Sequence, residues 1–280
     1  MGEAHDTDAA RQTRFLGKHR LPHLWGPMAG TAILGRVTWR TATVVGLHEE
    51  TTTARTIILA VRDWPGHVAG QHVDVRLTAP DGYSAVRSYS IASAPSSDGR
   101  IEITVERLPN GEVSPYLTQE VMVGDELELR GPIGGWFVWR SDQTEPIQLL
   151  AGGSGIVPLM AMLRSRSSAA SAAPFRLLYS VREPRAVFYR DELRALSNQG
   201  DSVVITYAYT RVTPKEWPRP AGRIDAELIA VGTWPSSLRP TSYVCGPTSF
   251  VEHATDLLIA AGHDREKVRT ERFGATGERK

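Results

Sequence analysis

The sequence predicts two domains, a small antiparallel β-barrel followed by an α/β domain with a parallel sheet. The chain has 280 residues, which is more than one hydrophobic core usually contains. In its first half, short apolar segments are separated by turn signals, a spacing typical of a small barrel. In its second half, strand-like and helical segments alternate, which favours βαβ units around a parallel sheet.

The composition is that of an ordinary folded protein, with 41% hydrophobic and 22% charged residues. Lys and Arg number 32 against 31 Asp and Glu, so the overall charge excludes electrostatic recruitment of nucleic acid or of an anionic membrane. No apolar run approaches the roughly 20 residues of a membrane span, and the N-terminus lacks the apolar core of a signal peptide. We therefore expect a cytoplasmic protein without a membrane span.

The single cysteine, Cys245, excludes several structures within one chain. An intrachain disulfide framework, a cysteine zinc site and a cysteine-ligated iron–sulfur cluster all need more cysteines. We expect no metal site.

Residues 37–141 form the predicted barrel, and residues 1–36, which have no sustained period, form a predicted N-terminal arm. Turn signals such as Pro65-Gly66 and Pro109-Asn110-Gly111 separate the expected strands. These strands are Arg40–Val45, Thr56–Val61, His72–Leu77, Ser88–Ala92, Ile101–Leu108 and Asp125–Leu129. One helix is expected at Ser114–Glu120, capped by Ser114 and with Pro115 in its first turn.

Residues 142–280 form the predicted α/β domain. Its expected strands are Ile147–Ala151, Phe175–Ser180, Val203–Tyr209 and Ser242–Cys245. Its expected helices are Leu159–Ser165, Tyr189–Leu196, Asp225–Ala230 and Ser249–Ala260. Ligands of such a sheet bind at the carboxyl ends of the strands.

Two glycine turns follow strands of this domain. The segment 152–158, Gly-Gly-Ser-Gly-Ile-Val-Pro, lets a pyrophosphate or a flat ring approach the backbone beside a helix N-terminus. It fits neither a nucleophile elbow nor a P-loop, because the required Gly and Gly-Lys-Ser/Thr are missing. The second turn is Cys245-Gly246-Pro247. Together they predict a cleft for a dinucleotide, although Cys245 is equally consistent with a buried apolar residue.

In the barrel half, the segment Arg87-Ser88-Tyr89-Ser90 offers a fork of donors for phosphate, an aromatic face and a hydroxyl. The ordered set of this segment, the Gly111–Ser114 segment, Gly131-Pro132-Ile133-Gly134 and the two glycine turns resembles the ferredoxin–NADP reductase superfamily. The resemblance covers about residues 39–274. It implies a Greek-key barrel that binds FAD and an α/β domain that binds NAD(P).

The resemblance implies roles for residues of the barrel. Arg87 would bind the flavin diphosphate, Tyr89 would pack on the isoalloxazine, and Ser90 would hydrogen-bond near the flavin nitrogen that accepts hydride. A second flavin segment would comprise Thr104, Val105, Gly111, Val113 and Ser114, and Ser88 belongs to the first. Some relatives with the same motif bind FMN, which is the less favoured alternative to FAD.

The resemblance also implies a nicotinamide site. Its lining would be Gly153, Ser154, Gly155, Cys245, Gly246 and Pro247. Glu271 and Phe273 resemble the family's terminal Glu-x-aromatic, whose aromatic residue covers the flavin. With Ser90 and Cys245, Glu271 would be catalytic. Thr210 and Arg211 stand where NADP-preferring relatives hold the 2′-phosphate, so NADPH is favoured over NADH, with Arg182 and Arg190 as alternatives.

The implied reaction is hydride transfer from NADPH to FAD, followed by electron transfer to a separate acceptor. The expected acceptor is a protein, such as a ferredoxin or a haem or molybdenum protein, of unknown identity. The alternatives are a reductase of a small acceptor, namely a quinone, a ferric chelate or free flavin, and a cofactor-binding subunit without turnover of its own.

Overall fold

The computed structural model describes residues 38–198 and 203–273. The predicted arm, residues 1–36, lies outside the described residues, and the domain boundary at residues 141 and 142 stays a prediction. In the part of the chain that is described, no helix is both long and apolar enough to cross a bilayer.

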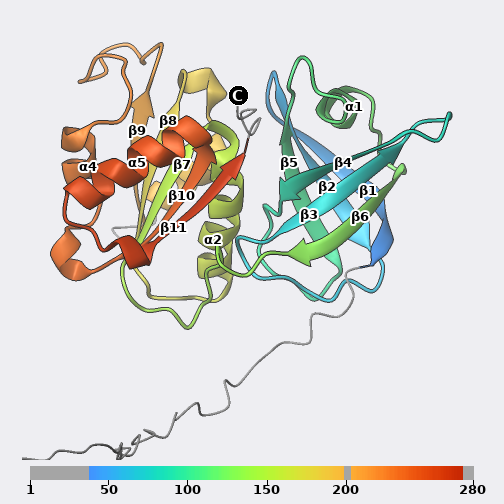
Figure 1. Cartoon of the computed structure of the whole chain (residues 1–280), viewed down its shortest axis with the longest axis horizontal. Helices are drawn as coiled ribbons and strands as arrows, with labels where there is room; N and C mark the ends of the chain where they lie inside the picture. Colours follow the sequence, from blue (N-terminus) through green and yellow to red (C-terminus); the bar gives the residue numbers. More distant parts are fainter. Residues whose placement is uncertain (1–37, 199–202, 274–280) are drawn as a thin grey trace, which may run out of the picture. The chain divides into compact units, whose positions relative to one another are not determined.

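The first sheet is a six-stranded antiparallel sheet, as predicted (Figure 1). Its order is β4-β3-β6-β1-β2-β5, so the last strand returns beside the first. An isolated bridge between Ile91 and Ile103 joins the segment after β4 to β5 and closes the sheet into a barrel. The strands are β1 (Trp39–Thr51), β2 (Ala54–Val61), β3 (His72–Thr78), β4 (Ser84–Ser90), β5 (Arg100–Glu106) and β6 (Glu126–Ile133).

The helix of the barrel, α1 (Ser114–Gln119), has Pro115 in its first turn, but the predicted capping by Ser114 is wrong. The N-cap position is Val113, and no side chain caps the helix. The Ser114 hydroxyl instead accepts a hydrogen bond from the backbone N–H of Leu108, at 3.0 Å. Ser114 therefore fastens the preceding loop, an alternative use of a short polar side chain.

The second sheet has five parallel strands in the order β11-β10-β7-β8-β9. The strands are β7 (Ile147–Gly152), β8 (Phe175–Val181), β9 (Val203–Tyr209), β10 (Thr241–Pro247) and β11 (Val268–Phe273). The helices are α2 (Ile156–Ser168), α3 (Arg190–Ser197), α4 (Ala226–Gly232) and α5 (Thr248–Ala260). Short 3₁₀ turns lie at Gly153–Gly155, Pro184–Ala186, Ser236–Leu238 and Arg265–Lys267. Strand β11 is absent from the sequence prediction.

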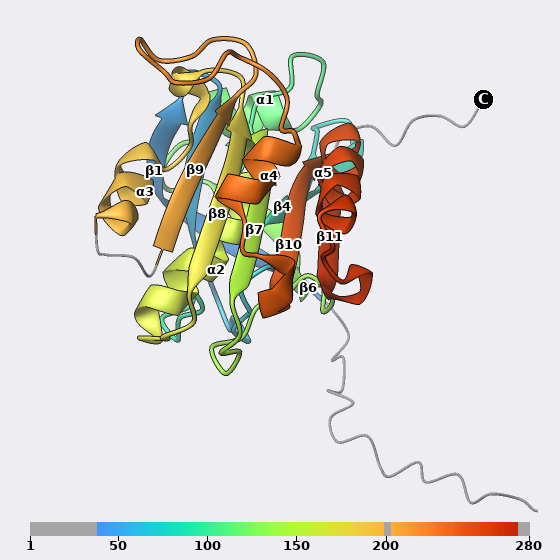
Figure 2. The ribbon, with the colours of Figure 1, turned by 90° about the vertical axis from the view of Figure 1, so that its left-hand side faces the viewer.

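Helices cover both faces of the parallel sheet (Figures 1 and 2). Leu149 and Leu177 pack with α2 and α3, whereas Leu150 and Leu178 pack with α4 and α5. Burial on both faces explains why β7 is apolar along almost its whole length. Such a sheet leaves its strand ends free for a ligand.

Polar side chains join β5 to the helices of the parallel sheet. Along β5, Ile101, Ile103 and Val105 are buried in the barrel core, because side chains of a strand alternate between its two faces. The opposite face carries Glu102, which pairs with Arg164 of α2 at 2.7 Å. It also carries Thr104, whose hydroxyl accepts a hydrogen bond from the Tyr189 hydroxyl.

Candidate functional site

The last residue of β4 contacts the edge strand of the parallel sheet. The Ser90 hydroxyl donates a hydrogen bond to Oε1 of Glu271 on β11, at 3.2 Å. Glu271 stands opposite Cys245 of β10 in the strand register. The structure therefore brings together the three residues predicted to be catalytic, although they come from distant parts of the sequence.

Burial controls the protonation of two of these residues. It raises the pKa of Glu271 from 4.5 to about 7, against a smaller opposing effect of the Ser90 hydrogen bond. The pKa of the fully buried Cys245 thiol is raised well above its usual value, first by burial and then by the nearby Glu271 carboxylate. Glu271 is consequently able to exchange a proton near neutral pH, whereas Cys245 stays a neutral thiol.

The two segments expected to bind FAD lie side by side. Nη2 of the half-exposed Arg87 bonds Oε2 of Glu112 at 2.6 Å, and Glu112 belongs to the Gly111–Ser114 segment. Tyr83 donates to the same carboxylate. The guanidinium of Arg87 remains accessible to an anion, so the residues fit a diphosphate at this position.

Ser88 and Tyr89 lie on opposite faces of β4, because side chains alternate along a strand. The Ser88 hydroxyl donates to Oδ1 of Asp74 at 2.6 Å. Tyr89 packs against the barrel core, and burial raises its pKa to about 12, with Arg87 acting in the opposite direction. Tyr89 therefore stays a neutral phenol with an aromatic surface.

The second flavin segment has little side-chain surface left for a cofactor. Val105 and Val113 lie in the barrel core. The Thr104 hydroxyl bonds Thr56 and Tyr189, and Ser114 bonds the chain near Leu108. For these residues the backbone is the part available to FAD, and their cofactor role stays a prediction.

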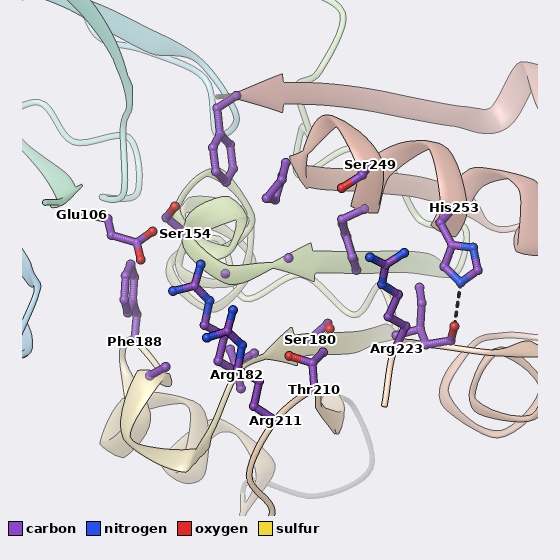
Figure 3. Close-up of a pocket in the computed structure, with 18 residues that line it drawn as sticks. Glu106, Ser154, Ser180, Arg182, Phe188, Thr210, Arg211, Arg223, Ser249 and His253 are labelled. Atoms are coloured by element: carbon purple, nitrogen blue, oxygen red, sulfur yellow. Dashed lines mark hydrogen bonds between the residues drawn. The ribbon is translucent and has the colours of Figure 1, made fainter. Parts of the chain in front are cut away.

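A cavity of about 410 Å³ lies at the carboxyl ends of the parallel strands (Figure 3). It contains five of the residues predicted for the dinucleotide site, Gly153, Ser154, Thr210, Arg211 and Pro247, and also Phe273, which was predicted to cover the flavin. The turns behind the cavity hold three further residues predicted for this site, Gly155, Cys245 and Gly246. These three are not among the described residues that line the cavity. A cavity therefore lies where the sequence predicts the dinucleotide cleft, and the binding of a dinucleotide there stays a prediction.

The two glycine turns pack backbone against backbone. A Cβ atom on Gly155 would lie 2.2 Å from the carbonyl oxygen of Cys245. Gly153 has φ +55° and open space where a side chain would stand. These positions explain the glycines physically, and they leave a bare backbone surface that suits a pyrophosphate or a ring.

Three guanidinium groups line the cavity, those of Arg182, Arg211 and Arg223. In the described part of the chain, none of them has a carboxylate within 4.0 Å. The backbone N–H of Arg211 donates to the carbonyl of Arg182 at 2.9 Å, which fixes the two loops together. Such a set of donors fits the phosphates of a dinucleotide.

Sequence reasoning missed Arg223, Phe188 and Glu106 as cavity residues. Arg223 lies in the loop between β9 and α4, where no motif marks it. Arg190, considered as an alternative phosphate ligand, is not among the described lining residues and donates to the carbonyl of Pro184. The turn after β8 brings Arg182 into the cavity.

Two family models match the chain. One is described as an oxidoreductase FAD-binding domain and covers residues 53–138. The other is described as an oxidoreductase NAD-binding domain and covers residues 149–256.

Individual relatives agree with these matches. The glycine betaine monooxygenase reductase subunit of Chromohalobacter salexigens is 30% identical over 74% of this chain and 56% of the relative. The reductase component of propane 2-monooxygenase from Rhodococcus jostii is 29% identical over 73% of this chain and 55% of the relative. The chain thus spans little more than half the length of these curated relatives.

A solved structure shares the fold. The flavohem-like FAD/NAD-binding domain of the nitric oxide dioxygenase of Vibrio cholerae superposes with a TM-score of 0.75 at 24% identity, covering 86% of this chain and all of that chain. Fold and matches define an oxidoreductase with one FAD-binding and one NAD-binding domain. The chain belongs to the ferredoxin–NADP reductase superfamily. The family prediction, the fold class and the cofactor pair FAD and NAD(P) are confirmed.

Proposed function

We propose that this protein passes electrons from NADPH through FAD to a separate acceptor protein. The observation that carries this proposal is the Ser90–Glu271 hydrogen bond. It places the end of the predicted flavin segment against the strand that flanks the dinucleotide cavity. We also propose that residues 37–141 hold FAD and residues 142–280 hold the nicotinamide dinucleotide, with domain matches at 53–138 and 149–256 as support.

Bound FAD supplies the chemistry that accepts a hydride and releases electrons one at a time. The protein's own residues supply binding, orientation and a proton. Arg87 neutralises the diphosphate, and Tyr89 provides the stacking surface. Glu271, with its pKa of about 7, holds a proton at its carboxylate next to the Ser90 hydroxyl. Cys245 contributes a small uncharged wall.

The preference for NADPH rests on the charge of the cavity. Arg211 follows β9 beside Thr210, and Arg182 and Arg223 add two more cations to the same cavity. These guanidinium groups would bind the negatively charged 2′-phosphate of NADPH strongly. The uncharged ribose diol of NADH would gain no comparable charge attraction from them.

The proposed acceptor is a partner oxygenase or its electron carrier. Two relatives are named as the reductase subunit or component of a monooxygenase. An FAD-loaded sample that oxidises NADPH with artificial dyes, but not with quinones, ferric chelates or free flavin, would support a protein acceptor. Rapid turnover with one of those small molecules would contradict it.

Cofactor analysis tests the basis of the proposal. We expect purified protein to be yellow, to release FAD on heating, and to show flavin bleaching when NADPH is mixed in a stopped-flow instrument without oxygen. Protein that cannot be loaded with FAD, or whose bound flavin is not reduced by NADPH or NADH, would refute it.

The Arg211→Ala variant tests the coenzyme preference. Because a hydrogen bond to a charged group contributes about 1.5–3 kcal/mol, we expect kcat/KM for NADPH to fall about 10- to 100-fold. The value for NADH should hardly change. Arg265→Ala is the control, since Arg265 is exposed and is not a cavity residue. Equal losses with both coenzymes would remove Arg211 from the 2′-phosphate site.

A further inference from the structure

One carboxylate faces the same cavity from the barrel. Glu106 is the last residue of β5, and among the described residues that line the cavity it alone is an Asp or Glu. Its side chain points away from the barrel core because Val105, its neighbour, points inward. No Lys or Arg of the described ranges lies within 4.0 Å of the Glu106 carboxylate.

The charges of the cavity are distributed unevenly (Figure 3). Glu106 lies next to Ser154 and to the ring of Phe188. Arg223 lies at the other side, with Ser249 and His253. Among its described lining residues the cavity thus has one carboxylate, on the barrel side, and Figure 3 shows Arg182 and Arg211 between it and Arg223.

This distribution matters because only one part of a nicotinamide dinucleotide changes charge in the reaction. The phosphates are anionic in both redox states, so the arginines attract both states alike. The nicotinamide ring is cationic when oxidised and neutral when reduced. A fixed carboxylate near the ring therefore favours the oxidised form.

We infer that Glu106 sets the relative affinity of the protein for oxidised and reduced dinucleotide, through its charge beside the nicotinamide ring. This inference rests on the proposed function, in which the nicotinamide ring meets the flavin on the barrel side of the cavity, where Glu106 lies. Tighter binding of the oxidised form lowers the reduction potential of the bound couple, which favours hydride donation to FAD. A tenfold ratio corresponds to about 30 mV for this two-electron couple.

The test compares dissociation constants of the FAD-loaded protein for NADP⁺ and for tetrahydro-NADPH, a reduced analogue whose ring is uncharged and cannot donate hydride. Calorimetric titrations at one fixed pH and ionic strength give both constants. The variants are Glu106→Gln, which removes the charge but keeps the shape, and Glu106→Asp, which keeps the charge. Glu126→Gln is the control, since Glu126 is an exposed residue of β6 outside the cavity.

In Glu106→Gln we expect the dissociation constant for NADP⁺ to rise roughly five- to tenfold, as for a partly screened charge pair. The constant for tetrahydro-NADPH should stay within about twofold, and Glu106→Asp and Glu126→Gln should keep the wild-type ratio. An unchanged ratio in Glu106→Gln, or the same change for both ligands, would overturn the inference. If Glu106→Gln does not retain FAD, the same ratio of dissociation constants is compared between Glu106→Asp, which keeps the charge, and Glu106→Ala, which removes it. The inference then requires the ratio to change only in Glu106→Ala.

The inference and the proposed function fail differently. Suppose that wild-type protein binds FAD and is reduced by NADPH, while substitution of Glu106 leaves the ratio of the two dissociation constants unchanged. In that case only the inference is wrong. If wild-type protein binds neither dinucleotide form, the proposed function itself is wrong.

Discussion

At the scale of single residues, Glu271 shows how local environment determines chemistry. Its carboxyl is largely buried, with one hydrogen bond from Ser90, and its pKa is raised to about 7. The folded protein therefore disfavours the ionised carboxylate. A group with this property is suited to holding a proton at neutral pH, and it also makes stability depend on pH.

The Glu271→Gln variant tests this pKa. Below about pH 4.5 the carboxyl is neutral in both folded and unfolded chains, so its burial costs nothing. As pH rises through 7, ionisation becomes favourable in the unfolded chain first, and the wild-type protein loses stability. The free energy of unfolding of Glu271→Gln, relative to wild type, should increase between pH 5 and pH 8 by on the order of 2–3 kcal/mol. Urea titrations at each pH measure the free energy of unfolding, with Glu126→Gln as the control variant. A difference between Glu271→Gln and wild type that does not change with pH would contradict the raised pKa of Glu271.

Gly155 provides a second prediction at this scale. An alanine there would place Cβ 2.2 Å from the Cys245 carbonyl, so the two glycine turns would have to move apart. We expect Gly155→Ala to lower the free energy of unfolding by about 2–4 kcal/mol and to weaken dinucleotide binding. Gly135→Ala is the control, because nothing lies within 4 Å of its added Cβ. Similar denaturation midpoints for both variants would show that the turns adapt.

At the scale of elements, strand β5 has two separate functions. Its inward residues complete the barrel core, while Glu102, Thr104 and Glu106 contact α2, Tyr189 and the cavity. Tyr189 has φ 53°, an uncommon value for a tyrosine. Its backbone N–H donates to Glu50 at 2.8 Å and its hydroxyl bonds Thr104, so the barrel holds it in that conformation.

The Tyr189→Phe variant tests this link. It removes one buried hydrogen bond and leaves Thr104 bonded to Thr56. We expect a loss of about 1–2 kcal/mol in the free energy of unfolding. Tyr116→Phe, at a half-exposed position without a described hydroxyl partner, should cost less than about 0.5 kcal/mol. Equal effects of the two substitutions would mean that the link adds no stability.

At the scale of the whole molecule, the described fold forms continuous apolar contacts. The cluster under α2 includes Ala54, Ala69 and Ala92 of the barrel, as well as Trp139 after β6. Burying such shared surface couples the unfolding of the two sheets.

Calorimetry tests this coupling. We expect a single unfolding transition of the FAD-loaded protein. Free FAD at about 100 times its dissociation constant should stabilise the whole fold by about 2.7 kcal/mol. Arg87→Ala should lose most of this stabilisation, whereas Arg265→Ala should retain it. Two separate transitions, with only one shifted by FAD, would show that the sheets unfold independently.

The sequence predicted the barrel and the parallel sheet because apolar segments and turns mark them strongly. It did not predict β11, since four of the six residues in Val268–Phe273 are polar and the strand lies at the edge of the sheet. The helix expected from Tyr189 begins at Arg190, because contacts with Glu50 and Thr104 hold Tyr189 outside it. Local patterns carry no information about such distant contacts.

The same limit applies to the site. The sequence predicts the glycine turns and the Arg87–Ser90 segment as cofactor-binding segments because their order and residue types resemble those of the family, and this role stays a prediction. Arg223 and Glu106 reach the cavity only through the arrangement of a loop and a strand end. Their recognition needs the folded structure.

The two-sided strand β5 has a consequence for exchanging modules among relatives of this protein. A chimaera that receives a foreign barrel would keep its own core but would lose the matched partners of Arg164 and Tyr189. Successful recombination would have to transplant residues 102 and 104 together with their counterparts on the other half. Compatibility between the halves therefore depends on the outward side chains of β5 together with the pairs Glu50–Tyr189 and Ser90–Glu271.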